Sequence, residues 1–397
     1  MERREFVQTT VLGAAALASS RLARALDVGV RLPAPGTTVH VSPVTGNDAN
    51  AGGKSAPLRT LPEAARRVSR GAGSGPLTVV LSEGIHAVGE TALFNPPRGR
   101  FTRTDRLTIR AEVLPDDPGW HHGRMPTLIH TLPVKDTWNG RPDPLGGAAD
   151  GMLIETSHVS IRGLRVLGMP VVETPREGMI RRLYAVSRLR EDLDDLEVAQ
   201  CVFAGDEVIA PNHVGIIARG NGLVVDHCVF RGLKISAVYW SGGSTGHAMR
   251  HCVNDGLYGS AVWTAGIADD FDYRNNVVAN CNYAWTHQDA SSARADAGGQ
   301  RGAAGVAAGA PAQPRARSRY RVLDSHFANN RRLAGSGTGA RLEYQDIDPS
   351  FLELVGTKVT EQRAAFEHEQ AKPSYLHPVA GSEAAATGAG LFMTRRA

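Results

Sequence analysis

The feature that most constrains this chain is an internal repeat with a regular step. The segment 225–230, Val-Asp-His-Cys-Val-Phe, recurs at 249–254 as Met-Arg-His-Cys-Val-Asn and, after the same interval, at 273–278 as Tyr-Arg-Asn-Asn-Val-Val. Repeats of this length, built from short strand-like runs with Gly and Asn at the bends, are typical of a parallel β-helix, in which each coil buries its apolar face against the next. The same frame fits three further segments: 161–166, 198–203 and 322–327.

Stacked coils align equivalent positions of this frame into columns, so the residue types at each position predict where its column faces. The first and sixth positions are mostly apolar, and we expect both to point into the core. The fourth position holds Cys201, Cys228 and Cys252, which lie a whole repeat apart and so give no short C-x-x-C metal motif. We therefore expect a buried cysteine ladder. The first column reads Ile161, Val198, Val225, Met249, Tyr273 and Val322.

The chain before the repeats predicts a cap. Strand-like runs at 38–42 and 77–81 flank a helical pattern that follows Thr60, and Glu63 lies three residues further on, as in a capping box. We expect this helix to close one end of the solenoid, with the cap and coils together spanning 38–287.

Periodicity stops at 288–318, where Ala, Gly, Arg and Pro dominate. This composition predicts a flexible insertion between two coils. Residues 319–397 are then expected to form the last coil or coils and a C-terminal tail.

Residues 1–25 are typical of an export signal: a charged start, an apolar stretch and an Ala-Arg-Ala cleavage motif at 23–25. The pair Arg3-Arg4 resembles the twin-arginine signal of bacteria. We expect a periplasmic or extracellular protein, with a Pro/Gly linker over 26–37.

Composition narrows the classes further. A chain of 397 residues with 42% hydrophobic and 21% charged residues is not an intrinsically disordered protein. The formal net charge of +4 consists of +2 in segment 1–25 and +2 in segment 288–318, which leaves the remainder near neutral. No basic patch with interleaved aromatics is present, so no nucleic acid partner is expected. No apolar run outside 1–25 is long enough to span a membrane. The sequence does not indicate an oligomeric state.

Two further regions carry a family likeness. Residues 41–64 contain Val-Ser-Pro, Gly-Asn-Asp and Asn-Ala-Gly, and the tail contains Leu-His-Pro-Val-Ala-Gly-Ser at 376–382 and Gly-Ala-Gly-Leu-Phe at 388–392. These regions resemble the two ends of secreted bacterial proteins of the pectate-lyase-like superfamily. The resemblance implies an all-β fold, a right-handed parallel β-helix solenoid with an N-terminal capping helix. It also implies a carbohydrate partner, whether polysaccharide or oligosaccharide, but it does not select a reaction.

The second frame position is expected to face outward, where Asp226, Arg250 and Arg274 would form a continuous row. Stacked guanidiniums are costly without a shared anion, and the carboxylate of a uronic acid fits a bidentate arginine. The row therefore favours a polysaccharide lyase that acts on uronate-containing glycans. The alternative is a set of solvated surface charges in which Asp226 offsets Arg250.

A lyase must also supply a base to remove the proton next to the sugar carboxyl group. Lys234 is the one lysine within the central coils, and its column is expected to continue as Tyr258 and Asn282. His227 and His251 stack in the third column, and His251 is a second candidate base. The alternatives are a loop lysine and a polar ladder at the end of the strands. The lysine-arginine motifs expected of alginate lyases and of chondroitinase B are absent. The full set of polygalacturonase motifs is absent as well.

Two other classes stay open. A glycoside hydrolase needs two carboxylates across the scissile bond, which Asp255 and the loop 269–272 would supply. A noncatalytic β-helix would only bind glycan or a cell surface.

Aromatic residues cluster on the second strand of the repeat. Tyr239, Trp240, Trp263 and Trp285 are candidates for stacking on sugar rings, or are core residues. Asp226 and Tyr258 are further candidate contacts with the substrate. No metal-ligand set is readable, although calcium is conceivable at the acidic residues Asp206 and Glu207 or in the Asp269 loop.

Overall fold

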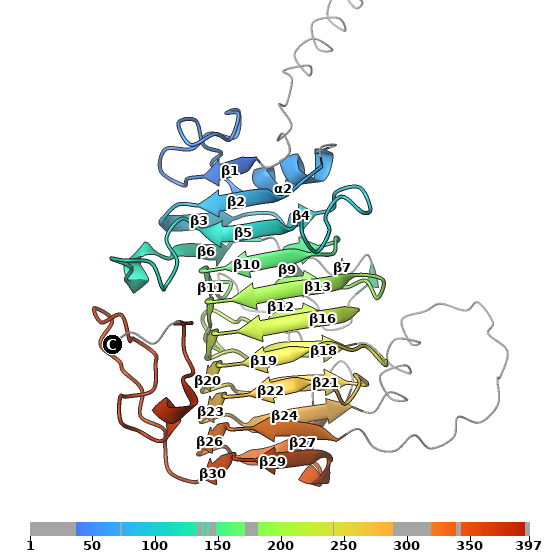
Figure 1. Ribbon diagram of the computed structural model, residues 1–397, viewed down its shortest axis with the longest axis vertical. Helices are drawn as coiled ribbons and strands as arrows, with labels where there is room; N and C mark the ends of the chain where they lie inside the picture. Colours follow the sequence, from blue (N-terminus) through green and yellow to red (C-terminus); the bar gives the residue numbers. More distant parts are fainter. Residues whose placement is uncertain are drawn as a thin grey trace, which may run out of the picture. The chain divides into compact units, whose positions relative to one another are not determined.

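The computed structural model describes residues 37–71, 74–132, 137–138, 141–142, 148–170, 182–240, 242–288, 319–338 and 343–393. Within them, strands stack into three long sheets whose neighbours are parallel, apart from one strand at the end of the third sheet (Figure 1). Successive strands along the chain pass from one sheet to the next, so that each coil contributes to all three. The chain is a right-handed parallel β-helix, as predicted.

Sheet 1 contains the strand that opens each frame. Its ten strands are, in spatial order, β1 (Thr38–Val41), β2 (Leu77–Leu81), β5 (Leu107–Ala111), β10 (Val159–Arg162), β13 (Asp194–Ala199), β16 (Asn221–Asp226), β19 (Ala248–Arg250), β22 (Asp272–Arg274), β25 (Tyr320–Leu323) and β29 (Leu352–Val355).

Sheet 2 follows after a tight bend and has mostly three-residue strands: β3 (Gly84–Val88), β6 (Pro126–His130), β11 (Arg165–Leu167), β14 (Val202–Ala204), β17 (Val229–Arg231), β20 (Val253–Asp255), β23 (Val277–Ala279), β26 (His326–Ala328) and β30 (Lys358–Thr360).

Sheet 3 closes each coil. Its strands are β4 (Ala92–Phe94), β9 (Ala148–Ile154), β12 (Arg182–Arg188), β15 (Val214–Ala218), β18 (Ile235–Trp240), β21 (Ser260–Ala265), β24 (Tyr283–Gln288), β27 (Arg332–Thr338) and the antiparallel β28 (Glu343–Asp346). The short strands β7 (Thr137–Trp138) and β8 (Arg141–Pro142) pair separately, and 3₁₀ turns among the described residues cover His122–Arg124, Pro349–Phe351 and Ala384–Thr387.

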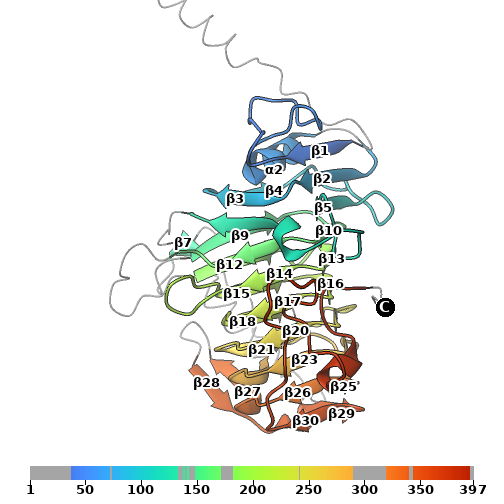
Figure 2. The same ribbon diagram turned by 90° about the vertical axis from the view of Figure 1, so that its left-hand side faces the viewer.

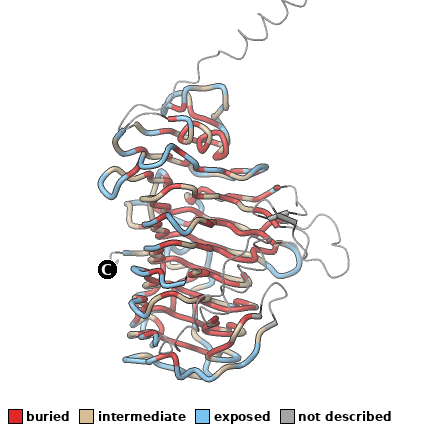
Figure 3. The backbone as a smooth tube through the Cα atoms, turned by 90° about the vertical axis from the view of Figure 1, so that its right-hand side faces the viewer, coloured by how far each residue is buried: buried red, intermediate tan, exposed pale blue. Residues whose placement is uncertain are grey.

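The register confirms the predicted columns. Val225 pairs with Met249, and Met249 pairs with Tyr273, so the step of the sequence repeat is the step between coils. The whole first column is buried, and in the sixth column the rings of Phe203 and Phe230 stack with centroids 5.1 Å apart. These inward columns form the continuous core that appears as buried residues along each coil (Figure 3).

The cysteines occupy the core as expected. All four are buried and form no disulfide bond, and burial raises the pKa of the Cys201 and Cys228 thiols well above the ordinary range. Such protonated thiols behave as small apolar side chains.

The third frame position forms the bend from sheet 1 to sheet 2. Gln200, His227, His251 and Asn275 have φ angles of +55°, +48°, +50° and +58°, in the left-handed region. Non-glycine residues adopt this conformation at a cost, and Asn is among those that tolerate it best. The bend therefore fixes where each side chain of this column leaves the backbone.

Both ends of the solenoid are covered. Helix α2 (Leu61–Arg70) packs against β4 at the N-terminal end, and the Thr60 hydroxyl accepts a hydrogen bond from the Glu63 amide at 3.3 Å. This confirms the capping helix, although the Thr60 amide donates to Asp48 rather than to Glu63. The C-terminal tail runs along the outer face of sheet 2 (Figure 2), where its apolar residues cover a row of outward valines. The members of this contact include Val202, Val229, Val253, Val277, Phe366, Leu376, Ala389 and Leu391.

Several predicted segments lie outside the described residues: the signal 1–25, the linker 26–37 except for Thr37, and the insertion 288–318 except for Gln288, which ends β24. Among the residues that are described, no helix is long and apolar enough to cross a membrane.

Candidate functional site

Each coil bends twice near sheet 2, and polar side chains from successive coils gather at both bends. The bend between sheets 1 and 2 carries Asp226, His227 and His251, together with the charged row on β19 and β22; we call it the histidine corner. The bend between sheets 2 and 3 carries a cleft lined by asparagines and arginines; we call it the arginine cleft.

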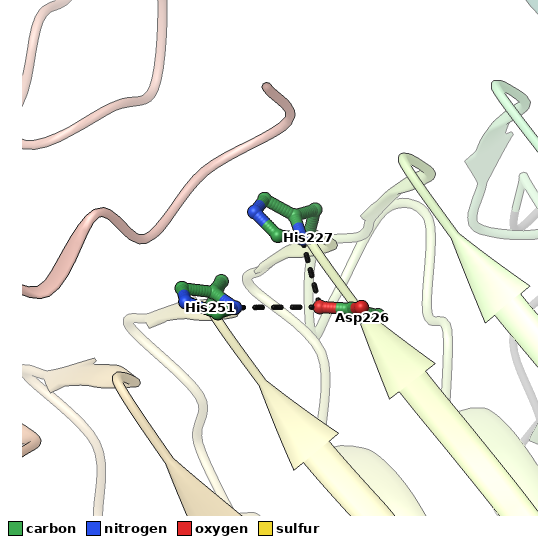
Figure 4. Close-up of side chains that lie close together, drawn as sticks. All are labelled: Asp226, His227 and His251. Carbon is green, nitrogen blue, oxygen red and sulfur yellow. Dashed lines mark hydrogen bonds and ion pairs between the residues drawn. The ribbon is translucent and has the colours of Figure 1, made fainter. Parts of the chain in front are cut away.

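The histidine corner is centred on one carboxylate. Asp226 ends β16, and its Oδ1 lies 2.8 Å from His227 Nδ1 and 3.5 Å from His251 Nδ1 (Figure 4). The two imidazoles stack with ring centroids 4.4 Å apart. Burial opposes ionisation of Asp226, but its interactions with His227 and His251 outweigh that effect and hold the pKa of this carboxyl well below its usual range. The predicted stacking of these histidines is therefore present, with Asp226 as their common partner.

The predicted row of Asp226, Arg250 and Arg274 is in register, but its charges are paired differently from the expectation. Arg250 Nε and Arg274 Nε donate to Asp272 at 2.6 Å each, and both Nη2 atoms also lie within 2.6 Å of this carboxylate. Asp272 precedes Tyr273 on β22 and faces outward beside Arg274. The expectation that Asp226 offsets Arg250 is wrong, because Arg250 is paired with Asp272, a carboxylate that it shares with Arg274.

Lys234 lies away from this row. It precedes β18 at the bend between sheets 2 and 3, whereas Arg250 and His251 lie at the bend between sheets 1 and 2. A strand of sheet 2, covered on its outer face by the C-terminal tail, separates the two bends. The predicted catalytic set of Lys234, Arg250, Arg274 and His251 therefore does not form one site.

The predicted column through Lys234 is also shifted by one position. Ile235 pairs with Ser260 rather than with Gly259, so Gly259 and not Tyr258 lies opposite Lys234. Asn282 does continue the column, because Ser260 pairs with Tyr283. The missing side chain of Gly259 leaves room that Lys234 Cγ and the Tyr344 hydroxyl occupy.

The surroundings of Lys234 change its protonation. Its ammonium lies 6.0 Å from the centroid of the Tyr344 ring. Burial lowers the pKa of Lys234 to about 8, with Arg182 adding to the decrease and Glu207 opposing it. Burial raises the pKa of Tyr258 above its usual range, and the charges of Glu207 and Asp206 add to the increase. A lysine that loses its proton readily thus lies one coil from a tyrosine that keeps its own.

The arginine cleft follows on the next coils. It has a volume of about 590 Å³ and its lining includes Tyr258, Asn282, Arg331 and Arg363. Arg331 Nη1 donates to Asn282 Oδ1 at 2.9 Å. Within the part of the chain that the structure describes, neither arginine has an ion pair within 4.0 Å, although Arg331 interacts electrostatically with Asp346, the carboxylate that pairs with Arg332. The other lining residues are Gly256, Leu257, Asn280, Cys281, Asn329 and Asn330.

The aromatic candidates divide between core and surface. Tyr239 and Trp285 are fully buried, and the Tyr239 hydroxyl donates to Ala248 O, so the predicted contact of these two residues with sugar is wrong. Trp240 and Trp263 are half-buried on the outer face of sheet 3, where the Arg219 guanidinium lies 4.9 Å from the Trp240 ring. Tyr258 is the aromatic candidate that lines the cleft.

The carboxylates expected of a hydrolase do not face one another. Asp255 ends β20 on sheet 2 and accepts a hydrogen bond from Asn280, whereas Asp272 is held by two arginines on sheet 1. The candidate calcium ligand Asp206 accepts backbone hydrogen bonds from Val208 and Ile209 within its own loop.

Some features of both sites were not anticipated from the sequence. Asp272 was expected only as a hydrolase carboxylate, but its pairing with Arg274 had a readable signal, because alternate residues of a strand share a face and Asp272 lies two positions before Arg274. Tyr344 and Arg363 had none, since they come from an antiparallel strand and the tail, outside the repeat. The joint arrangement of Asp226, His227 and His251, whose ligand atoms all lie within 4.8 Å of one another, was not expected as a possible metal site.

The strand pairing places the chain in the class of right-handed parallel β-helix proteins. No protein-family model matches the chain, and no curated protein matches its sequence. Among solved structures it is similar to a rhamnogalacturonan lyase, with a TM-score of 0.45 and 13% identity over 74% of this chain and 69% of that chain.

It is also similar to the GH136 lacto-N-biosidase of Eubacterium ramulus, with a TM-score of 0.42 and 13% identity over 81% of this chain but only 55% of that chain. A pectin methylesterase in complex with a hexasaccharide gives a TM-score of 0.41 and 12% identity over 84% of this chain and 94% of that chain. At these scores the likeness does not bear on the reaction or the substrate of this chain.

Proposed function

We propose that this chain is an exported, carbohydrate-active β-helix protein that binds uronate-containing polysaccharide in the arginine cleft and cleaves it as a lyase. The observation that carries the proposal is the pair Arg331 and Arg363, which line a polar cleft and form no close ion pair with a carboxylate among the described residues. Because each guanidinium can bind a carboxylate through two parallel hydrogen bonds, an acidic sugar supplies the missing partner. The asparagine row offers further donors and acceptors for sugar hydroxyls.

The groups beside the cleft fit β-elimination. Arginine binding of the sugar carboxylate acidifies the adjacent C–H, and a neutral amine can remove that proton. The electron pair then forms a C=C bond as the glycosidic C–O bond breaks, and the leaving oxygen takes a proton. Lys234, with its pKa of about 8, is assigned as the base, and Tyr258 as the donor of the second proton.

The test uses the full chain with a panel of uronic acid polymers, and follows the absorbance of the conjugated double bond in the product. Lys234→Met should abolish the product while leaving glycan binding within a few-fold of wild type. The matched control is Lys54→Met, since Lys54 is 79% exposed on the N-terminal cap.

Wild-type rates in both Lys234→Met and Tyr258→Phe would contradict the assignment of acid and base. Binding without product, for every polymer, would favour the noncatalytic glycan-binding alternative. That alternative is supported by one observation: Lys234 itself is not among the residues that line the cleft. The hydrolase alternative has less support, because Asp255 beside the cleft lacks a facing carboxylate from the loop 269–272.

Export is a separate part of the proposal and rests on the sequence of residues 1–25. Replacement of Arg3 and Arg4 by lysine should retain the charge but stop export through the twin-arginine route. Cell fractionation of the producing bacterium checks this, and periplasmic accumulation of the double variant at the wild-type level would contradict it.

A further inference from the structure

We propose that Asp226, His227 and His251 bind one divalent transition-metal ion of the zinc type. The inference does not depend on the function proposed for the arginine cleft. The donor set is two imidazole nitrogens and one carboxylate oxygen, which suits Zn²⁺ and its neighbours in the first transition row rather than Ca²⁺ or Mg²⁺, whose sites are built from oxygen.

The three donors already converge. Both Nδ1 atoms lie close to Asp226 Oδ1, at 2.8 Å for His227 and 3.5 Å for His251, and all three ligand atoms lie within 4.8 Å of one another (Figure 4). A tetrahedral zinc ion with ligands at about 2.0–2.1 Å holds its ligand atoms about 3.3 Å apart. The His251 distance nearly matches this separation, and the His227 distance needs to open by about half an ångström.

The backbone supports the arrangement. Asp226 ends β16, and each histidine follows the last residue of a sheet 1 strand, so the strand register fixes the spacing between the ligands. Both histidines have the left-handed backbone conformation that is common to this column, so both side chains leave the backbone in the same direction. The tail adds support on one side, because the Gly390 amide donates to His251 O at 2.9 Å.

One of the ligand atoms at the histidine corner makes no hydrogen bond within the protein. His251 Nδ1 is buried and has no hydrogen-bond partner among the described residues, although it points toward Asp226. The neighbouring Arg250 would repel a cation, but its guanidinium is bonded to Asp272 at 2.6 Å. The cluster therefore offers one imidazole nitrogen without a hydrogen bond, and a carboxylate whose neighbour Arg250 is bound to another carboxylate.

A second His–Asp pair shows what an ordinary ion pair looks like in this fold. His158 Nδ1 lies 2.9 Å from Asp195 Oδ2, and Arg106 Nη1 lies 2.5 Å from the same oxygen. His158 also has a positive φ, of +60°. The guanidinium there takes the place that the second imidazole has beside Asp226, which leaves a single imidazole and a carboxylate that is already neutralised. His158→Asn is therefore a matched control.

The experiment titrates Zn²⁺, and separately Co²⁺, into the full chain free of any histidine tag, by calorimetry and by the visible absorbance of bound Co²⁺. The test variants are His227→Asn, His251→Asn and Asp226→Asn, of which the first two place the residue type of Asn275 at the bend. Ca²⁺ serves as the comparison ion. Circular dichroism and thermal melting confirm that each variant is folded.

We expect one equivalent of Zn²⁺ per chain, with the melting temperature raised by Zn²⁺ but not by Ca²⁺. Loss of an outer-shell partner of a metal ligand typically weakens affinity about 10–100-fold, so loss of a direct ligand should weaken it by at least about 100-fold. His158→Asn should bind as wild type does. The proposal is overturned if the wild type binds neither ion, or if folded Asp226→Asn and His251→Asn variants bind with wild-type affinity.

Discussion

The histidine corner and the arginine cleft are formed by the same stacked coils, but their arginines differ in whether a carboxylate of the protein pairs with them. At the histidine corner, Asp272 holds both Arg250 and Arg274, and Asp226 is held by imidazoles. At the arginine cleft, Arg331 and Arg363 line the cleft and form no close ion pair with a carboxylate among the described residues. The difference shows that a row of charges in register is not by itself a binding surface. The row of Arg250 and Arg274 includes its own counter-charge, Asp272 on the same sheet. Arg331 and Arg363 come from separate elements, and we expect a bound ligand to supply their counter-charge.

The largest effect is expected on glycan affinity. Replacement of Arg331 and Arg363 together by alanine should weaken binding of an acidic oligosaccharide about 100-fold, because each lost charged hydrogen bond is worth about 1.5 kcal/mol or more. Calorimetric titration measures this. The double variant Arg250→Ala, Arg274→Ala should change the affinity for the oligosaccharide less than twofold. An equally large loss of affinity in this variant would contradict the proposed difference between the two corners.

The next effect concerns the desolvated lysine. The pKa of Lys234 falls from 10.5 to about 8 on folding. Between these two values the unfolded chain binds more protons, so stability should rise with pH, and the full penalty applies below pH 8. Lys234→Met removes a penalty of about 2–3 kcal/mol at pH 7 and should flatten the dependence between pH 8 and 10.5. Urea unfolding at several pH values measures this. An unchanged slope in Lys234→Met, relative to Lys54→Met, would contradict the buried environment of the amine.

A smaller effect is expected at the histidine corner. Asp272→Asn leaves two neighbouring guanidiniums without their anion and should destabilise the fold by about 1–2 kcal/mol, with less loss at high salt. Asp269→Asn, on the exposed loop before β22, is the control. Denaturant unfolding at low and high salt measures both, and equal stability of the two variants would mean that Asp272 is not the neutralising group.

The smallest effect is expected for Arg274→Ala. Its side chain is 46% exposed, and Asp272 keeps Arg250 after the substitution. The unfolding free energy should fall by no more than about 0.5 kcal/mol, in line with surface ion pairs in general. A loss as large as that of Asp272→Asn would show that the row acts as one cooperative unit.

The fold was predictable because the repeat encodes it directly. Val225, Met249 and Tyr273 share a column because they share a frame position, and the parallel register keeps that relation. Arg250 and Arg274 are neighbours for the same reason. The step of the repeat does not hold at Lys234, because the sheet 3 strands pair one position beyond it and Gly259 takes the place of the expected neighbour Tyr258.

The sites were less predictable because they combine the repeat with residues outside it. Arg363 comes from the tail and Tyr344 from the antiparallel β28, and no spacing rule relates either to Lys234. The burial of Tyr239 could not be predicted for another reason. Aromatic residues occur both on the inward face of a strand and on its outward face, so the residue type does not show which face it occupies. Side-chain pairing such as that of Asp272 depends on geometry within a few ångströms, which a short sequence frame only outlines.

The tail that covers the outer valines of sheet 2 has a consequence for synthesis. The row from Val202 to Val277 is translated long before its cover, which includes Phe366 and Leu391. Until residues 366–391 have been synthesised, a strip of apolar surface stays exposed to water and to other chains. A copy that stops before these residues leaves the apolar strip exposed, and proteases and chaperones can bind it there. In a copy that includes them, the tail covers the strip.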